Sequence, residues 1–171
     1  MDVRGLRVTI FGMAKSGVAT LELLKARGAV VRASDSRVRE VLPEFEGEFV
    51  EQGEAALEGC ELAVLSPGVP ADLPLMEEAR RRGIRVVGDV EAANWFLKGP
   101  VMGITGSNGK TTTTALCGHL LKTAGVACQV GGNIGTPLAQ MVDSSRDDQW
   151  NVLELSSFQL ETSETLRVRI A

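Results

Sequence analysis

The sequence lacks the cysteine pattern of a disulfide framework or a zinc site. Its three cysteines, Cys60, Cys117 and Cys128, are odd in number, and no two of them form a Cys-x-x-Cys pair. This absence excludes a small disulfide-stapled fold. We expect buried free thiols in a reducing compartment.

Long hydrophobic runs and an excess of basic residues are also missing. The first apolar run, Val8 to Ala14, is too short to cross a bilayer and is followed by Lys15. The 18 Lys and Arg residues stand against 22 Asp and Glu, which gives a net charge of -4. We therefore expect a cytoplasmic protein that binds neither membranes nor nucleic acid, and no obligate protein partner is evident.

What is present is the composition and patterning of a folded α/β protein. The hydrophobic content of 44% and the charged content of 23% are typical of globular domains. Short β-branched runs alternate with longer helical stretches, which predicts parallel sheets with helical crossovers. The expected strands are 7–11, 30–34, 49–50, 62–65, 85–87, 101–105, 128–130 and 150–153, and the expected helices are 16–27, 75–82, 91–97, 110–124 and 137–142.

The best linker candidate is Lys98-Gly99-Pro100, because Gly and Pro together interrupt the periodicity. We predict an N-terminal Rossmann-like parallel-sheet domain at 1–98, followed by a P-loop ATP-binding α/β domain at 99–171. Residues 167–171 have the pattern of a further strand, and about 73 residues are few for an ATP-using α/β unit. We expect the second domain to be truncated and the chain to be a fragment.

A glycine-rich segment, Thr105-Gly106-Ser107-Asn108-Gly109-Lys110-Thr111-Thr112, follows a predicted strand and opens a predicted helix. Backbone amides of such a turn point at phosphate oxygens, and the positive end of the helix adds to the attraction. Lys110 can reach the β and γ phosphates, and the Thr111 hydroxyl can ligate Mg²⁺. Ile104 stands at the first glycine position of GxxxxGK[ST], but the strand–loop–helix context still favours ATP binding. The predicted contacts are Gly106, Ser107, Asn108, Gly109, Lys110, Thr111 and Thr112.

Polar residues at the ends of two later strands complete this predicted site. Magnesium prefers hard oxygen ligands, and P-loop enzymes place an acid at the end of a neighbouring strand. Glu154 ends the strand 150–153 and is the predicted metal ligand beside Thr111. Ser156 and Gln159 follow at once and suit a substrate edge, while Asn133 lies in a second glycine-rich turn and could offer its amide to a ligand.

The first unit carries a near-match to a dinucleotide fingerprint. Gly12 to Gly17 reads GxAxxG rather than GxGxxG, and Asp35 lies 18 residues beyond Gly17, where a ribose-binding acid is expected. An NAD-binding Rossmann protein is therefore one interpretation, although Ala14 replaces the glycine that lets a backbone approach a pyrophosphate. The other interpretation is a different diphosphate, such as a UDP-sugar, and its polar contacts would be Lys15, Ser16, Ser36 and Arg37.

With these segments in place, the chain resembles the Mur ligase family over its whole length, and within it the branch that adds D-glutamate. The Glu-Leu-Ser-Ser-Phe-Gln-Leu run is the most specific element of the resemblance. The matching segments are Ile104 to Thr112, Gly131 to Gly135, Leu153 to Glu161, and Ser66-Pro67-Gly68.

The resemblance implies an ATP-dependent ligase of peptidoglycan precursor synthesis. ATP and Mg²⁺ would activate the carboxylate of UDP-N-acetylmuramoyl-L-alanine as an acyl phosphate, and the amine of D-glutamate would then form the amide. By this resemblance Lys110 and Glu154 are catalytic, and Thr111 and Glu154 hold the metal. Asn133, Ser156 and Gln159 would line the muramoyl-alanine side, and Ser16, Ser36, Arg37 and Gly68 would hold the UDP end.

Family members also use a later histidine, a carbamylated lysine and a third domain, for which these 171 residues offer no counterpart. We therefore expect no ligase turnover from this chain alone. Two alternatives remain at this point: a non-catalytic module that binds a nucleotide or UDP-sugar, and an NAD-dependent Rossmann protein.

Overall fold

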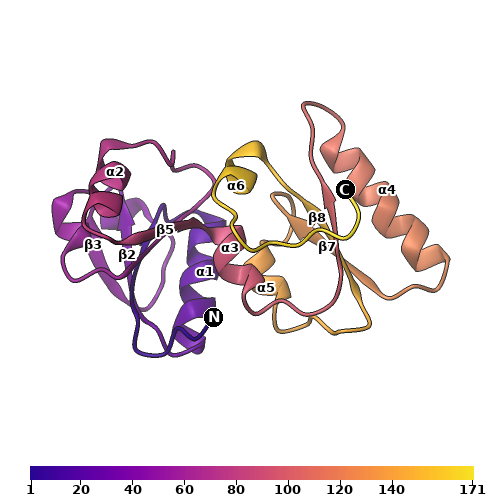
Figure 1. Cartoon of the computed structure of the whole chain (residues 1–171), viewed down its shortest axis with the longest axis horizontal. Coiled ribbons are helices and arrows are strands. Elements are labelled where there is room, and N and C mark those ends of the chain that lie inside the picture. Colours follow the sequence, from indigo (N-terminus) through magenta and orange to yellow (C-terminus); the bar gives the residue numbers. More distant parts are fainter.

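The computed structural model describes residues 1–171 and contains two parallel sheets that lie side by side along the long axis of the molecule (Figure 1). Every strand pair within either sheet is parallel, and helices connect most of the successive strands. The predicted α/β class with parallel sheets is therefore confirmed. No helix of the chain combines the length and the apolarity that a bilayer crossing requires.

The first sheet has five strands in the order β3-β2-β1-β4-β5. Its central strands are nearly continuous hydrophobic runs, as expected where helices or loops cover both faces of a parallel sheet. The direction of strand addition reverses between β1 and β4, and such reversals create ligand-binding crevices at the carboxyl edge. The elements are β1 (Arg7–Phe11), α1 (Lys15–Ala26), β2 (Val30–Asp35), η1 (Arg39–Val41), β3 (Glu48–Glu51), η2 (Glu54–Leu57), β4 (Leu62–Leu65), α2 (Pro74–Arg81), β5 (Arg85–Gly88) and α3 (Asp89–Asn94).

The second sheet has three strands in the order β6-β8-β7. Its longest helix, α4, follows β6 and runs along one side of the sheet (Figure 1). Its elements are β6 (Val101–Ile104), α4 (Lys110–Thr123), β7 (Cys128–Gly132), α5 (Leu138–Met141), β8 (Trp150–Glu154) and α6 (Ser157–Glu161).

Three differences from the sequence-based expectation lie near the cleft or at the end of the chain, in addition to the unpredicted short helices η1 and η2. Helix α3 begins at Asp89, two residues before the predicted start at Glu91. Helix α6 was not predicted, although a capping box between Ser156 and Gln159 marks its start. The expected strand at 167–171 forms only one parallel bridge, between Met102 and Ile170.

Hydrophobic side chains of three helices pack between the two sheets. Leu23 of α1, Val90 of α3 and Leu138 of α5 belong to one buried cluster with Leu153 of β8. Burying an aliphatic side chain of this size contributes about 1.5–3 kcal/mol. The two sheets are thus joined by a shared apolar core.

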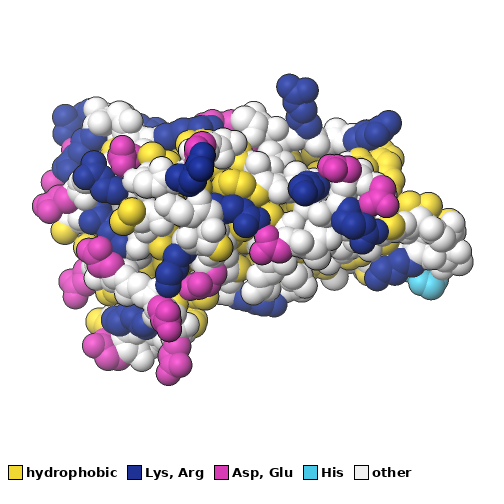
Figure 2. All heavy atoms as spheres, turned by 90° about the horizontal axis from the view of Figure 1, so that it is seen from below, with side chains coloured by type: hydrophobic (Ala, Val, Ile, Leu, Met, Phe, Trp, Pro, Cys, Tyr) yellow, Lys and Arg dark blue, Asp and Glu magenta, His cyan; other side chains and the backbone are white.

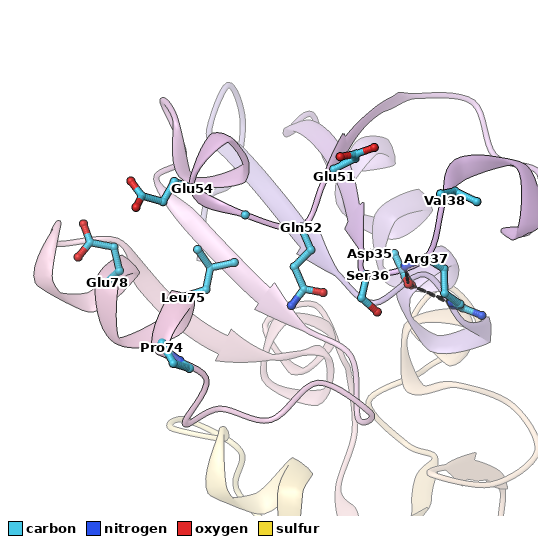
Figure 3. Close-up of a pocket in the computed structure, with 11 residues that line it drawn as sticks. Asp35, Ser36, Arg37, Val38, Glu51, Gln52, Glu54, Pro74, Leu75 and Glu78 are labelled. Carbon is cyan, nitrogen blue, oxygen red and sulfur yellow. Dashed lines mark hydrogen bonds and ion pairs between the residues drawn. The ribbon is translucent and has the colours of Figure 1, made fainter.

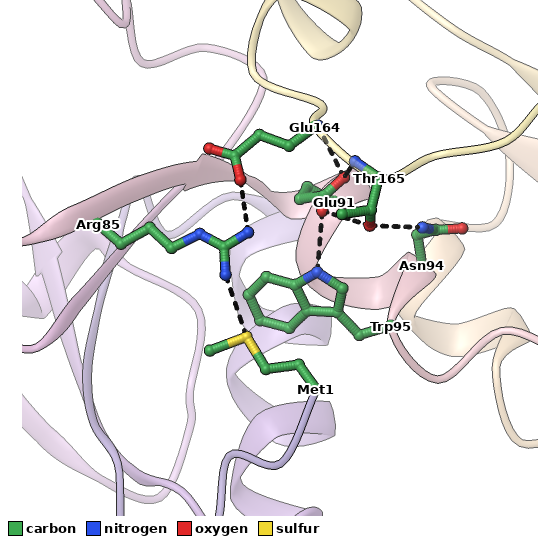
Figure 4. A network of polar contacts seen from close by, with 7 residues as sticks. All are labelled: Met1, Arg85, Glu91, Asn94, Trp95, Glu164 and Thr165. Atoms are coloured by element: carbon green, nitrogen blue, oxygen red, sulfur yellow. Dashed lines mark hydrogen bonds and ion pairs between the residues drawn. The ribbon is translucent and has the colours of Figure 1, made fainter.

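A buried carboxylate reinforces this junction (Figure 4). Glu91 of α3 is fully buried and accepts hydrogen bonds from the amides of Glu164 and Thr165, each at 2.9 Å. It also accepts from the Thr165 hydroxyl at 2.6 Å and from the Trp95 indole nitrogen at 2.9 Å. Burial alone would raise the pKa of Glu91, but the donors outweigh it, so the pKa lies below its ordinary value. Glu91 therefore ties the segment after α6 to the first sheet as a carboxylate.

Arg85 extends the same network at the surface. Its guanidinium pairs with the Glu164 carboxylate at 2.5 Å and lies 5.2 Å from the centre of the Trp95 ring. Nearby, the Gly88 amide donates to the Thr162 carbonyl at 3.0 Å, and a Cβ on Gly88 would fall 2.2 Å from the Thr162 hydroxyl. The close approach of these two backbones therefore requires glycine at position 88.

Figure 2 shows that charged side chains of both signs intermingle over the half of this face that belongs to the first sheet. The half that belongs to the second sheet carries fewer charges in this view. Two leucines of α4, Leu116 and Leu120, are more than half exposed. The two halves thus differ in surface character.

The Glu91 network predicts a pH-dependent loss of stability in a Glu91→Gln variant. At pH 7 the substitution replaces the charged acceptor of four hydrogen bonds, so we expect a loss of about 1–3 kcal/mol in the free energy of unfolding. Because the folded-state pKa is lowered, this contribution is complete above the unfolded pKa of about 4.3 and declines as the pH falls through the folded value. Urea unfolding of both proteins at pH 7, 5 and 3.5 measures the difference, and a gap that widens toward low pH would contradict the account.

Candidate functional site

The predicted phosphate loop lies between β6 and α4. Gly109 precedes the helix with a φ of +78°, a left-handed conformation that glycine adopts without a steric penalty. Because α4 begins at Lys110, the amides of its first turn have no partners within the helix. Gly106, Ser107 and Asn108 are exposed on the loop. The loop therefore offers free donors and the positive end of a 14-residue helix to an anion.

The ammonium of Lys110 lies over this loop. Its Nζ atom donates to the Gly106 carbonyl at 2.7 Å. The contact holds the ammonium beside the phosphate-binding amides, and a phosphate oxygen could replace the carbonyl as its acceptor. Thr112 is exposed on the first turn of the helix and makes no side-chain hydrogen bond.

Glu154, at the end of β8, links the first turn of α4 to the turn after β7. Its carboxylate accepts from the Thr111 hydroxyl at 2.8 Å and from the Asn133 amide nitrogen at 3.1 Å. Glu154 is 2% exposed, and neither donor carries a positive charge. The close approach of Gly132 to β8, where a Cβ would lie 2.4 Å from the Glu154 carbonyl oxygen, places Asn133 beside this carboxylate. A buried anion with neutral partners and a hydroxyl alongside suits a divalent cation.

Ser156 and Gln159 make hydrogen bonds to each other at the start of α6. The Gln159 side-chain oxygen accepts from the Ser156 amide at 3.0 Å, and the Ser156 hydroxyl accepts from the Gln159 amide at 3.2 Å. Gln159 is 2% exposed. The structure thus uses both residues to begin a helix, and their role toward a substrate stays a prediction.

A cleft of about 700 Å³ lies where the two sheets meet, and both contribute to its walls. Its lining contains the residues of the first unit that were predicted to contact the UDP end of the substrate. It also contains Asn133 of the second unit. Gln52, Ser66 and Pro67 also line it and were not predicted as contacts. The lining residues that matter here are Gly12, Ala14, Lys15, Ser16, Ser36, Arg37, Gly68, Asn133 and Gly135.

The GxAxxG turn forms one wall of this cleft and is held by close contacts. A Cβ on Gly17 would fall 1.9 Å from the Gly12 carbonyl oxygen, so the turn cannot accommodate a larger residue there. The Ser66 hydroxyl donates to the same carbonyl at 2.6 Å. The Met13 amide donates to the Asp35 carboxylate, also at 2.6 Å. The ends of β1, β2 and β4 are therefore fixed relative to one another.

Two residues of this wall that were predicted to contact the UDP end already form hydrogen bonds with other residues of the chain. The Lys15 ammonium donates to the Gly135 carbonyl at 2.5 Å, across the cleft. The Ser16 hydroxyl donates to the Asp89 carboxylate, also at 2.5 Å. Lys15 and Ser16 thus help to hold the two walls and the turn in place.

Asp35, the candidate ribose-binding acid, is engaged by Arg37. The guanidinium donates to both carboxylate oxygens, at 3.0 and 2.9 Å, and the Arg37 amide donates at 2.9 Å. These hydrogen bonds from Arg37, together with that from the Met13 amide, hold the pKa of Asp35 well below its ordinary value. Asp35 therefore orients Arg37 at the cleft, and its oxygens are already occupied by donors.

A second cleft of about 660 Å³ continues from the first along the ends of β2 and β3 (Figure 3). The two clefts share Asp35, Ser36, Arg37 and Gln52. Figure 3 shows Gln52 between the Asp35–Arg37 pair and the carboxylates of Glu54 and Glu78. The carboxyl edge of the first sheet thus offers one long, polar groove.

Some residues that shape the cleft belong to no recognisable motif and were not predicted as site residues. Gln52 follows β3, whose pairing with β2 depends on contacts distant in the sequence. Ser66 was part of a matching segment, but its bond to the Gly12 carbonyl could not be read from spacing. Asp89 was also missed, because the predicted helix began after it.

Comparison with known families gives two matches that together cover most of the chain. Residues 6–88 match the model described as "Mur ligase MurD-like, N-terminal domain". Residues 104–171 match the "Mur ligase middle domain".

Curated relatives with the same name are similar over almost the whole chain. The chain is 58% identical over 173 residues to the UDP-N-acetylmuramoylalanine--D-glutamate ligase of Solibacter usitatus, covering 99% of this chain and 39% of that protein. It is 49% identical over 180 residues to the protein of that name from Koribacter versatilis, covering 100% of this chain and 40% of that protein. The chain thus spans about 40% of the length of these relatives.

The fold is also found in a solved structure. A murein peptide ligase from Psychrobacter arcticus aligns with a TM-score of 0.55 at 19% identity, over 90% of this chain and 38% of that one. With the two family matches and the curated relatives, the chain belongs to the Mur ligase family and comprises a MurD-like N-terminal domain and residues of the Mur ligase middle domain.

Proposed function

We propose that this chain supplies the UDP-binding and phosphate-binding parts of an ATP-dependent ligase that adds D-glutamate to UDP-N-acetylmuramoyl-L-alanine. The observation that carries the proposal is one cleft lined by both units, with Ser36, Arg37 and Gly68 on one side and Asn133 on the other. Asn133 also donates to Glu154, which in turn accepts from Thr111 of the phosphate loop. The two nucleotide sites are therefore linked through the same side chains.

The phosphates of ATP are proposed to bind the loop from Gly106 to Thr112. The amides of the first helical turn would receive phosphate oxygens, and Lys110 would exchange the Gly106 carbonyl for a phosphate oxygen. Exposure of the loop supports this role, because nothing has to unfold before a triphosphate reaches it.

Magnesium fits beside Thr111 and Glu154. Magnesium in nucleotide sites is commonly held by one or two carboxylates together with phosphate oxygens and water. The pair provides one carboxylate and one hydroxyl 2.8 Å apart. When bound, the ion would neutralise charge that develops on the phosphates, while the chain itself holds Glu154 in place through Asn133.

The UDP end is proposed to bind the groove at the carboxyl edge of the first sheet. Arg37 is oriented there by Asp35 and is half-exposed, so its guanidinium can donate to a phosphate or base oxygen. Ser36 and Gly68 are exposed in the same cleft. The cleft extends toward Asn133, and a substrate lying along it would direct its far end toward the phosphate loop.

The chemistry that follows is phosphoryl transfer and then amide formation. The carboxylate of the UDP substrate takes the γ-phosphoryl group of ATP, which gives an acyl phosphate and ADP. The amine of D-glutamate attacks the acyl carbon, and inorganic phosphate leaves. Both substrates are soluble nucleotides or amino acids, so we place the reaction in the cytoplasm.

The central prediction concerns Lys110. We expect Lys110→Met to weaken MgATP binding by about ten-fold or more, because a charge-assisted hydrogen bond to phosphate is lost. UDP affinity should stay within about two-fold, since Lys110 is absent from the groove of the first sheet. Isothermal titration of the chain with MgATP, UDP and NADH measures all three affinities.

The matched control is Lys122→Met, which removes an exposed ammonium near the far end of the same helix. It should leave both affinities unchanged. Equal MgATP affinity in wild type and Lys110→Met would sink the proposal, and tight NADH binding by the wild type would favour a dehydrogenase-like protein instead.

A second prediction concerns the metal. We expect Glu154→Gln to abolish most of the gain in ATP affinity that Mg²⁺ provides, because the amide keeps the shape but removes the anionic oxygen ligand. Titrations with ATP in magnesium and in EDTA give that gain for each protein. Glu161→Gln, an exposed change in α6, is the control. An unchanged magnesium effect in Glu154→Gln would rule out this metal site.

A further inference from the structure

Asp89 is a buried acidic residue to which neither the sequence motifs nor the family matches give a role. It is the first residue of α3 and is 5% exposed. One oxygen of its carboxylate accepts from the Ser16 hydroxyl at 2.5 Å. The other oxygen is buried without a hydrogen-bond partner. Burying a carboxylate costs free energy unless the group is paired and hydrogen-bonded.

The surroundings of Asp89 belong to both units. A small cavity of about 10 Å³ beside it is lined by Ser66 and Pro67 of the first unit and by Phe158 and Gln159 of the second. A space of this size holds about one water molecule. Burial raises the pKa of Asp89, with the Ser16 hydroxyl, the Val90 amide and the Gln159 side chain acting in the opposite direction. Asp89 thus lies where the loop after β4, the first turn of α1 and the start of α6 meet.

Ser16 connects this buried group to the large cleft. It lies in the first turn of α1 and lines the cleft together with Ala14 and Lys15. Helix α1 has no side-chain cap at Ala14, so its first turn lacks the usual local restraint. The bond from Ser16 to Asp89 is the side-chain contact that ties this turn to α3.

We propose that Asp89 is a positioning residue for the large cleft: through Ser16 it holds the Gly12–Gly17 turn in place against α3, so that the turn forms the wall that the UDP end contacts. This role rests on the proposed UDP site. Asp89 acts through Ser16, and Ser16 shapes the wall of the cleft. The phosphate loop does not depend on this contact, because its Thr111 donates to Glu154, which also accepts from Asn133 of the second unit.

The experiment compares UDP and MgATP affinities of the chain by isothermal titration in wild type, Asp89→Ala, Asp89→Asn and Ser16→Ala. We expect Asp89→Ala to weaken UDP binding about ten- to hundred-fold and to leave MgATP binding within about two-fold. Asp89→Asn keeps an acceptor for the Ser16 hydroxyl, so it should retain UDP affinity within about three-fold. Thermal unfolding confirms that each variant is folded at the titration temperature.

The double variant tests whether Asp89 acts through Ser16. In a Ser16→Ala background, Asp89→Ala should add less than about two-fold to the loss of UDP affinity, because the two residues form one unit. Additive losses would overturn the proposal. If Asp89→Ala does not fold, Asp89→Leu, which has a similar volume and no acceptor for the Ser16 hydroxyl, takes its place: a selective loss of UDP affinity supports the role, and unchanged affinity overturns it.

A control variant and the affinities of the wild type distinguish a failure of the Asp89 role from a failure of the proposed UDP site. Asp143→Ala, which removes an exposed contact with Arg27 between the units, is the control and should change neither affinity. A wild type that binds UDP, with Asp89→Ala unchanged or equally impaired for UDP and MgATP, overturns the positioning role alone. A wild type that does not bind UDP overturns the proposed function, and the role of Asp89 with it.

Discussion

The junction of the two sheets at α3 is the constraint on which the rest of the structure depends, and it combines a shared apolar core with the buried carboxylate of Glu91. Glu91 accepts three hydrogen bonds from residues 164–165 and one from Trp95, so the chain after α6 is fixed against the first sheet. Asp89 lies two residues earlier and accepts from Ser16. Because each sheet contributes one wall of the large cleft, its shape depends on this junction. The hydrophobic cluster around Val90 stabilises the contact between the two sheets. The hydrogen bonds to Glu91 fix how residues 164–165 lie against the first sheet.

Much of the fold and part of the site could be predicted from the sequence, since local patterns carry that information. Runs such as Leu62–Leu65 alternate with amphipathic stretches, and this alternation specifies parallel strands with helical crossovers. The loop from Gly106 to Thr112 combines glycines, one lysine and a hydroxyl at fixed spacing. Glu154 follows a strand that pairs with β6, so its place beside Thr111 follows from parallel topology.

What the sequence did not reveal depends on contacts between distant segments. Ser16 was predicted to face a ligand, yet its hydroxyl donates to Asp89, 73 residues away. Lys15 likewise donates to Gly135 in the other unit. Gln159 was predicted at a substrate edge, and it also completes the capping box of α6, a helix that was not predicted. In each case a polar side chain had several available partners, and only the tertiary arrangement selected one.

The central claim is that one chain holds two separate nucleotide sites at a shared junction. Backbone amide NMR shifts of the labelled chain, recorded with UDP and separately with a non-hydrolysable ATP analogue and magnesium, test it most directly. The account predicts that UDP shifts the amides of Gly12–Gly17, Ser36, Arg37 and Gly68, and that the ATP analogue shifts those of Gly106–Thr112. Shifts of Gly106–Thr112 by UDP, or no shift of these amides with the ATP analogue, would contradict it.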